Sequence, residues 1–328
     1  MSCAGRGWQG VGELFSKLKN RRAPGGLAGF AFDADGLGVA HIVRDKGRGP
    51  RLEGCRYIPC AEEPGRAAAA EDAVRQLGLD RRPAATVIDA TAYQLLLVEA
   101  PDVQPEELRG AVRWRIKDLI DFHIDDAVID VFEVPGQHST GASARLMYAV
   151  AARSQAVHTS IRRLDSAGID LKSIDIPEMC LRNVAALLPE DIEGVALLYL
   201  ARDYGLIVLT RQHTLYLARR IETGYAQLEA ADGAQFEALA GDIVLELQRS
   251  LDYYESHYMQ APIGHIAIAP TAVPLAALEA FVADNVSARV AACDLNALLD
   301  ITAPCDPALQ GLCLPAVGAA LRVEATAL

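Results

Sequence analysis

The spacing of apolar and polar residues predicts short strands and helices that fall into two similar halves. Asp33-Ala34-Asp35-Gly36 has the turn chemistry that joins two strands in a hairpin, and Gly78 is placed to end a helix. The predicted elements of the first half are strands at 27–32, 37–43 and 51–58, a helix at 67–77, and strands at 85–89 and 94–99. The order is strand, hairpin, strand, helix, strand.

The same order returns from Val195 onward. The predicted elements there are strands at 195–200, 205–210 and 214–220, a long helix with an apolar face from Phe236 to Tyr254, a strand at 265–269, a helix at 275–283, a strand at 288–292 and a helix near 317–321. The two halves share a pattern of elements, although not a sequence. This indicates an internal duplication.

A different unit separates the halves. The pattern predicts a helix that begins at Pro105 and buries Leu108, Val112, Ile116 and Leu119, strands at 128–134 and 145–151, a helix capped by Ser154 that ends at Gly168, and a helix at 177–188. We therefore expect a first domain of 27–93 with 171–194, an inserted α+β subdomain at 94–170, and a second domain at 195–328. The C-terminal helix of the second domain could return to the first.

Composition narrows the class of protein. The chain has 328 residues, 51% of them apolar, and a net charge of −12, which argues against disorder and against a nucleic-acid partner. No apolar run approaches the roughly 20 residues of a spanning helix, and the first residues lack a signal-peptide core, so we expect a cytosolic protein. The seven cysteines are scattered and never spaced as CxxC. We expect reduced, mostly buried thiols and neither disulfides nor zinc.

The charge is unevenly distributed. Residues 1–22 hold five basic side chains and one acidic side chain, a local charge of +4, which leaves −16 on the rest. Apolar residues recur there at helical spacing, and Pro24-Gly25-Gly26 ends the segment. Such a basic amphipathic segment, 1–26, either lies against a bilayer or a partner, or packs on its own domain or frays. The candidate contact residues in it are Trp8, Val11, Phe15, Lys17 and Lys19.

A second candidate contact surface lies in the inserted subdomain. Arg113, Trp114 and Lys117 group on its first helix, with a plain solvated face as the alternative for the charges. Trp114 and Phe122 are candidates for lining a groove, but a core position is the more frequent fate of large apolar residues. The pairs Arg81-Arg82 and Arg219-Arg220 are expected to be solvated.

Three segments resemble a known family. LFSKLK at 14–19 with GFAF at 29–32, WRIKDLIDF at 114–122 and LELQRSLDYY at 245–254 resemble segments of PilM-type proteins of type IV pilus assembly, most of all the branch that serves mannose-sensitive haemagglutinin (MSHA) pilus biogenesis. The likeness runs from 14 to about 322. It implies an α/β, actin-like (Hsp70/actin/FtsA-type) duplicated fold with an inserted α+β subdomain.

The resemblance also implies a location and partners. PilM-type proteins lie under the bacterial inner membrane and hold the short cytosolic N-terminal tail of a single-pass (bitopic) assembly protein, in a groove between the first domain and the inserted subdomain. The assembly ATPase is a further candidate partner. Peptide capture needs an apolar groove and free backbone groups but no phosphate chemistry.

The nucleotide-binding turns of actin-like ATPases are altered here. Those turns offer backbone N–H groups to phosphate, so they need glycine and small residues, with carboxylates beside them to organise a metal. The altered positions are Ala31, Asp33, Gly38, Tyr199, Ala201 and Pro270. We therefore expect no catalysis, no cofactor and no ATP or magnesium site. A nucleotide-binding actin-like ATPase with a divergent site is the alternative.

Other chemistry finds little support. Asp33-Ala34-Asp35-Gly36 resembles the start of a calcium loop but lacks the later ligands, and no two of the seven histidines have metal-ligand spacing. There is no Gly-x-Ser-x-Gly motif and no P-loop. A sugar or acetate kinase relative, the third hypothesis, would need a cleft carboxylate where Ala31 and Tyr199 stand. The first hypothesis is a non-catalytic scaffold.

Overall fold

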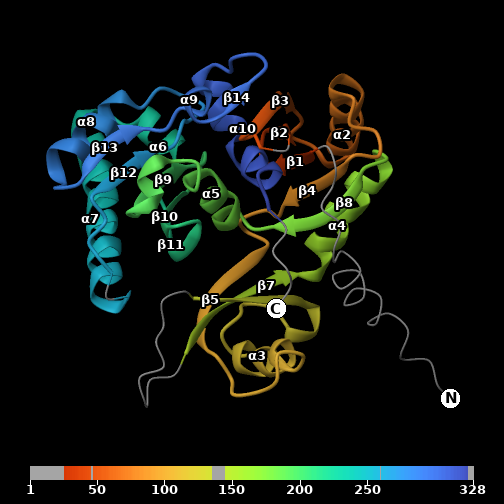
Figure 1. Ribbon diagram of the computed structural model, residues 1–328, viewed down its shortest axis with the longest axis horizontal. Helices are drawn as coiled ribbons and strands as arrows, with labels where there is room; N and C mark the ends of the chain where they lie inside the picture. The colour runs from red at the N-terminus through yellow and green to blue at the C-terminus, as the bar shows by residue number, and fades with distance from the viewer. Residues whose placement is uncertain (1–25, 46, 135–144, 259, 324–328) are drawn as a thin grey trace.

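The computed structural model describes residues 26–45, 47–134, 145–258 and 260–323, and these form two sheets with a smaller third sheet beneath them (Figure 1). The first sheet has the strand order β14-β3-β2-β1-β4-β8. Its strands are β1 (Leu27–Phe32), β2 (Gly36–Arg44), β3 (Pro50–Pro59), β4 (Pro83–Val87), β8 (Asp170–Asp175) and β14 (Asp300–Ile301). Helix α2 (Glu63–Leu77) ends at Gly78 in the left-handed conformation, with φ of 62°.

The second sheet repeats the pairing of the first. Its order is β11-β10-β9-β12-β13, from the strands β9 (Val195–Leu200), β10 (Gly205–Arg211), β11 (Thr214–Ile221), β12 (His265–Ile268) and β13 (Arg289–Ala292). In both sheets the first two strands are antiparallel, and the first strand lies parallel to the one that follows a helix. Because the topology is the same, the predicted duplication is confirmed.

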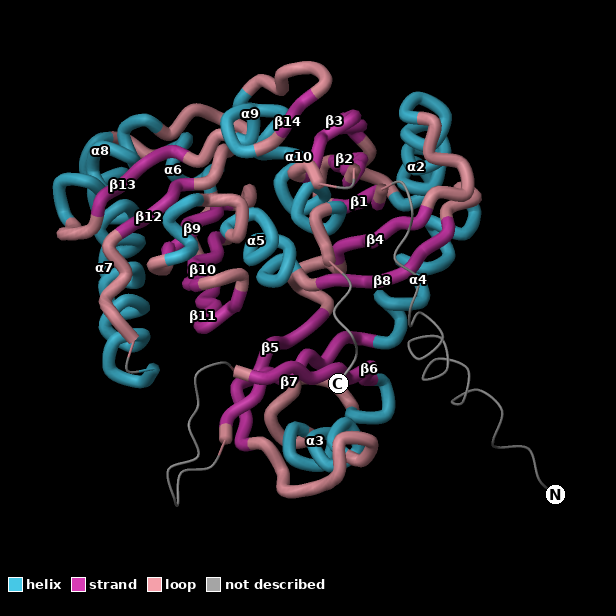
Figure 2. The backbone as a smooth tube through the Cα atoms, viewed as in Figure 1, coloured by secondary structure: helices cyan, strands magenta, loops and turns pink. Residues whose placement is uncertain are grey.

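The inserted unit is a three-stranded sheet, β5-β7-β6, with helix α3 (Leu108–Ile116) packed on it (Figure 2). Its strands are β5 (Tyr93–Glu99), β6 (Ala127–Glu133) and β7 (Leu146–Arg153). The helix does not begin at Pro105 as predicted, because the chain forms turns up to Glu107. Leu119, predicted to be buried, follows the end of the helix and is 57% exposed.

Helix α4 (Ser154–Ser166) differs from two expectations. Arg153, rather than Ser154, occupies the position before the first turn, and no side chain caps it. Although the predicted insertion contains this helix, Leu164 packs in one apolar cluster with Phe30 and Leu37 of the first sheet. The helix leads into β8, a strand that the sequence analysis missed and that pairs in parallel with β4.

Two helices lie between the sheets. They are α5 (Pro177–Ala185) and α10 (Pro307–Ala320), and α10 begins at Pro307 rather than near Val317. A single apolar cluster contains Leu314 and Val317 of α10 together with residues of both sheets. A β-carbon on Gly29 of β1 would lie 1.8 Å from the carbonyl oxygen of Ala316, so β1 and α10 pack backbone to backbone.

Three of the remaining α-helices, α6 (Tyr225–Ala230), α7 (Gly233–Tyr258) and α8 (Ala276–Asn285), cover the second sheet. The short α9 (Leu295–Leu298) lies beside β14 of the first sheet. Helices α6 and α9 were not predicted. None of the helices in the described residues combines the length and hydropathy of a membrane-spanning helix. Six cysteines are free thiols, as predicted, and four of them are buried. Cys3 lies outside the described residues.

Candidate functional sites at the hairpin cleft and beside the inserted sheet

In the first hairpin turn, a carboxylate side chain accepts hydrogen bonds from backbone N–H groups of the same turn. Asp33 Oδ1 accepts hydrogen bonds from the N–H groups of Asp35 at 2.8 Å and Gly36 at 2.6 Å, and from the Tyr57 hydroxyl at 2.8 Å. Loss of solvation around this carboxyl raises its pKa. In this turn, which the sequence analysis predicts to be an altered nucleotide turn, two backbone N–H groups are therefore already bonded to an acidic side chain of the same turn.

The second hairpin turn is linked to the first. Arg202 Nη1 lies 2.5 and 2.6 Å from the two carboxylate oxygens of Asp35. The carbonyls of Ala201 and Arg202 accept the N–H groups of Tyr225 and Ala226 at the start of α6, at 2.8 and 3.0 Å. Each side chain of the ion pair is 50% exposed, so solvent screens the attraction and the pair contributes little to stability. Its effect is to bridge the space between the two turns.

The other altered positions lie in packed surroundings. Ala31 and Tyr199 are buried in the cluster shared by the two sheets. A β-carbon on Gly38 would lie 2.8 Å from the carbonyl oxygen of Leu312, so this position faces α10. After the half-buried Pro270, the Thr271 hydroxyl donates to the Val273 carbonyl at 2.5 Å. In the described residues, no group of three or more acidic, histidine or cysteine side chains is placed to hold a metal.

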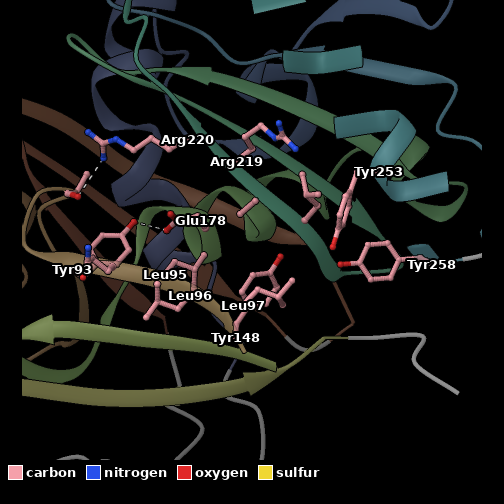
Figure 3. Close-up of a pocket in the computed structure, with 14 residues that line it drawn as sticks. Tyr93, Leu95, Leu96, Leu97, Tyr148, Glu178, Arg219, Arg220, Tyr253 and Tyr258 are labelled. Carbon is pink, nitrogen blue, oxygen red and sulfur yellow. Dashed lines mark hydrogen bonds between the residues drawn. The ribbon is translucent and has the colours of Figure 1, made fainter. Parts of the chain in front are cut away.

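A cavity of about 400 Å³ lies beside the inserted sheet (Figure 3). One wall is the consecutive run 93–97 of β5, and the other is the consecutive run 217–220 of β11. Neighbouring side chains of a strand point to opposite faces of the sheet, so a cavity on one face would be lined by every second residue. Because consecutive residues line this cavity, the edge of each strand meets it. Leu95, Leu96 and Leu97 make one side apolar, and Tyr148 and Tyr258 close it.

The edge of β5 is open. This strand lies at the edge of its sheet, and the backbone groups of its even-numbered residues face β7. At its two ends, the Ala92 carbonyl accepts the Arg153 N–H at 2.8 Å, and the Ala100 N–H donates to the Arg145 carbonyl at 2.6 Å. The N–H and C=O groups of Leu95 and Leu97 therefore point away from β7. Within the part of the chain that the structure describes, no strand pairs with them.

The edge of β11 is partly satisfied by side chains. The Tyr216 carbonyl accepts the hydroxyls of Tyr258 at 2.7 Å and Tyr148 at 3.3 Å. Arg220 lies over the Tyr204 ring, 4.2 Å from its centroid, and donates to the Ala90 carbonyl. One carbonyl of the β11 edge is therefore already bonded to side chains.

One ionisable pair lies at the base of the cavity. The Tyr93 hydroxyl donates to Glu178 Oε2 at 2.5 Å, and both side chains are buried. Burial raises the pKa of Glu178 and the pKa of Tyr93. Arg219 and Arg220, expected to be solvated, also line this cavity, and Arg219 pairs with Glu246 at 2.8 Å.

A second cavity, of about 270 Å³, lies between the ends of β1 and β4 and the start of α4. It is rich in arginine: Arg66, Arg153 and Arg163 line it. Arg163 pairs with Glu63 and lies over the Phe32 ring, 5.0 Å from its centroid. This cavity lies where the resemblance places a groove, whereas the larger cavity also takes a wall from the second half, which sequence reasoning missed.

The candidate contact residues of the inserted subdomain differ in their exposure and in their contacts. Trp114 is 70% exposed, contrary to the core position that its size favoured. Arg113 is half-buried and donates to the Ile124 carbonyl at 2.6 Å, which holds the turn that follows α3. Lys117 is exposed beside Asp118, and Phe122 is half-buried under Arg153. The candidates Trp8, Val11, Phe15, Lys17 and Lys19 lie outside the described residues.

Comparisons with known proteins establish the class of fold. No family model and no curated protein matches the chain. Among solved structures, the PilM–PilN type IV pilus biogenesis complex is similar, with a TM-score of 0.70, 18% identity and coverage of 91% of this chain and 98% of that chain. Together with the duplicated strand order, this likeness confirms the predicted actin-like fold with its inserted subdomain.

Two further structures are more distant. The cytoplasmic domain of EpsL, an inner-membrane component of the type II secretion system of Vibrio cholerae, has a TM-score of 0.48 and 12% identity over 88% of this chain and 94% of that chain. A Bacteroides thetaiotaomicron protein described as having an actin-like ATPase fold has a TM-score of 0.48 and 8% identity over 87% of this chain and 94% of that chain.

Proposed function

We propose that this chain is a non-catalytic scaffold that holds an extended peptide tail of a single-pass inner-membrane protein in a type IV pilus assembly platform. The observation that carries the proposal is the outer edge of β5, which meets a cavity with one side made apolar by Leu95, Leu96 and Leu97. A peptide strand gains main-chain hydrogen bonds from such an edge and side-chain contacts from the cavity walls. The hairpin cleft supports the absence of catalysis, because Asp33 and the Asp35–Arg202 pair occupy the phosphate side.

The finer assignment rests on the sequence segments. The segments 114–122 and 245–254 favour assigning this chain to the MshI branch, which serves the MSHA pilus. In that setting the protein is cytoplasmic and peripheral to the inner membrane, held there by the partner's tail. The assembly ATPase is a second proposed partner.

A titration with the partner's tail tests the proposal. The probe is a synthetic peptide of the cytosolic N-terminal tail of a single-pass type IV pilus assembly protein from the same bacterium, and calorimetry follows its binding. We expect a micromolar dissociation constant for the unchanged protein. Leu97→Glu should weaken it at least tenfold, whereas Leu245→Glu, at a site equally exposed on α7, should not change it.

The same titration separates the alternatives. Arg66→Glu alters the smaller cavity. If only this variant loses peptide affinity, the peptide binds in the smaller cavity instead of beside β5. No binding to the unchanged protein would reject the scaffold. Magnesium ATP should leave the melting temperature unchanged; a rise of several degrees would favour the divergent ATPase instead, because a ligand that binds the folded state stabilises it.

A further inference from the structure

The smaller cavity, of about 270 Å³, lies between the first domain and the entrance to the inserted subdomain. Its walls include Phe32 at the end of β1, residues 87–89 at the end of β4, and one face of α4. The residues on that face of the helix are Gln155, Ala156, Thr159, Ser160 and Arg163. Because Asp35 and Arg202 do not line it, this cavity is separate from the hairpin cleft.

Three guanidinium groups line the cavity, those of Arg66, Arg153 and Arg163. Arg163 and Arg66 lie over the same ring, that of Phe32, with their guanidinium carbons 5.0 and 5.9 Å from its centroid. Within the described part of the chain, the guanidinium of Arg66 donates one hydrogen bond, that of Arg153 one and that of Arg163 two. Since a guanidinium has five N–H donors, most of these donors remain for a ligand.

The charge around the cavity is positive. The three arginines and one acidic residue, Asp89, line it, a net charge of +2. Glu63 pairs with Arg163, Asp121 pairs with Arg153, and Arg162 donates to the hydroxyl of a lining threonine; counting these three neighbours leaves +1. Asp33 contributes its backbone carbonyl, which accepts from Arg66, whereas its carboxylate bonds within the hairpin turn. The cavity therefore favours an anion.

The start of α4 adds neutral donors at the same place. No side chain caps the N-terminus of this 13-residue helix, so the N–H groups of its first turn, which includes Gln155 and Ala156, have no side-chain acceptor. Ser160, one turn further along, is only 9% exposed and lines the cavity, but its hydroxyl has no hydrogen-bond partner among the described residues. A buried hydroxyl costs free energy unless a partner bonds to it. Both observations indicate a bound group that is rich in acceptors.

A phosphate group matches these donors. Its oxygens accept several hydrogen bonds at once, and both guanidinium groups and helix N-termini bind it well. The cavity has room for more than the phosphate, since a water molecule in the liquid takes only about 30 Å³. Asp89 indicates what else the ligand carries. Its Oδ1 accepts the N–H and the hydroxyl of Thr91 at 2.8 and 2.5 Å, whereas its Oδ2 accepts no hydrogen bond from the described residues and could accept one from a ligand hydroxyl.

We propose that the smaller cavity binds a small, water-soluble phosphate monoester that carries a hydroxyl group. Arg66, Arg163 and the first turn of α4 hold the phosphate, and Asp89 accepts the hydroxyl. The third guanidinium, of Arg153, also pairs with Asp121 of the inserted subdomain at 3.0 Å. A bound ligand therefore contacts the first domain and the junction with the insertion, and stabilises their arrangement. This site requires no peptide beside β5.

Calorimetric titration of the full chain at constant ionic strength tests the site. The probes are inorganic phosphate and glycerol 3-phosphate, with chloride as the control anion. We expect both probes to bind, glycerol 3-phosphate the more tightly, and chloride to give no binding heat. Arg66→Gln should weaken both by at least about tenfold, and Ser160→Ala by about threefold. Arg75→Gln, at an exposed position of α2, is the matched control and should change neither.

Two further variants separate the parts of the proposal. Leu97→Glu, at the edge of β5, should leave the binding of both probes unchanged, so a failure of the proposed peptide site would not affect this result. Asp89→Ala should reduce the preference for glycerol 3-phosphate over phosphate, because it removes the hydroxyl acceptor.

Three outcomes would overturn the phosphate site, and one would overturn the role of Asp89. The first three are no binding of either probe, equal weakening by Arg66→Gln and Arg75→Gln, and binding confined to vesicles that contain phosphatidic acid. The last of these would indicate a membrane contact instead. An unchanged preference in Asp89→Ala would show that the ligand hydroxyl does not bind there.

Discussion

Glu178 is a buried carboxyl group that accepts the Tyr93 hydroxyl at 2.5 Å, and this bond and the nearby charge of Arg220 offset only part of the effect of burial on its pKa. Burial raises its pKa above the usual 4.5, so the folded state binds a proton more tightly than the unfolded state. The free energy of unfolding therefore falls as the pH rises from the usual pKa of a glutamate to the raised pKa of the folded state. At pH values above the raised pKa, Glu178 is ionised in the folded state, and the full cost of burying its charge lowers the free energy of unfolding.

Glu178→Gln removes this charge and keeps an oxygen that can accept the Tyr93 hydroxyl. We expect the variant to exceed the unchanged protein in free energy of unfolding at pH 8, by on the order of 1 kcal/mol for each unit of raised pKa, and to lose that advantage below about pH 4. Denaturant titrations across this range measure it. Tyr93→Phe should lower stability by about 1–3 kcal/mol, because it leaves the carboxyl without its hydroxyl donor. A pH-independent difference for Glu178→Gln would contradict this account.

Among the elements, α10 has the closest packing. It follows the second half in the chain but lies on β1, β2 and α5, and small residues allow its backbone to approach theirs. The pattern of apolar residues located the end of this helix but not its start. Its beginning is set by Asp306, whose carboxylate accepts the Leu309 N–H, and by Pro307 in the first turn.

Gly29→Ala should lower the free energy of unfolding by at least about 2 kcal/mol, because its methyl group would collide with the backbone of Ala316. Urea denaturation measures the change. Gly110→Ala is the matched control, since α3 has open space at that position and alanine favours a helix by up to about 1 kcal/mol. Equal effects of the two substitutions would show that β1 and α10 are not in close contact.

At the scale of the molecule, one apolar cluster joins the two halves. It includes Leu52 of the first sheet, Leu197 of the second and Leu314 of α10. A core that spans both halves should make them unfold together, even though each sheet has its own topology. The inserted sheet has a separate small core around Val112 and Ile116.

Leu314→Ala should therefore destabilise both halves by about 2–5 kcal/mol in one transition. Hydrogen exchange should show protection falling in β1 and β9 to the same degree. Ile192→Ala, at an exposed position, should stay within about 0.5 kcal/mol of the unchanged protein. Loss of protection confined to one sheet would mean that the halves are independent units.

Local pattern determined much of the fold. The bounds of β1 and β9 match the prediction, because strands buried on both faces appear as short apolar runs between turn signals. Strand β8 was missed because Asp170 and Lys172 interrupt its apolar residues, and pairing with β4 supplies its stability. Helix α6 is only six residues long, too short for periodicity to reveal.

The sites divide in the same way. The sequence alone predicted, through its family resemblance, that the nucleotide turns are altered, and it showed the basic segment at 1–22, since both depend on residue type and spacing. Only the tertiary structure brought Asp35 to Arg202, set β5 opposite β11 and left Trp114 exposed. These features join residues far apart in the chain, and no local pattern records which strand edge stays unpaired or which face of a helix finds no neighbour.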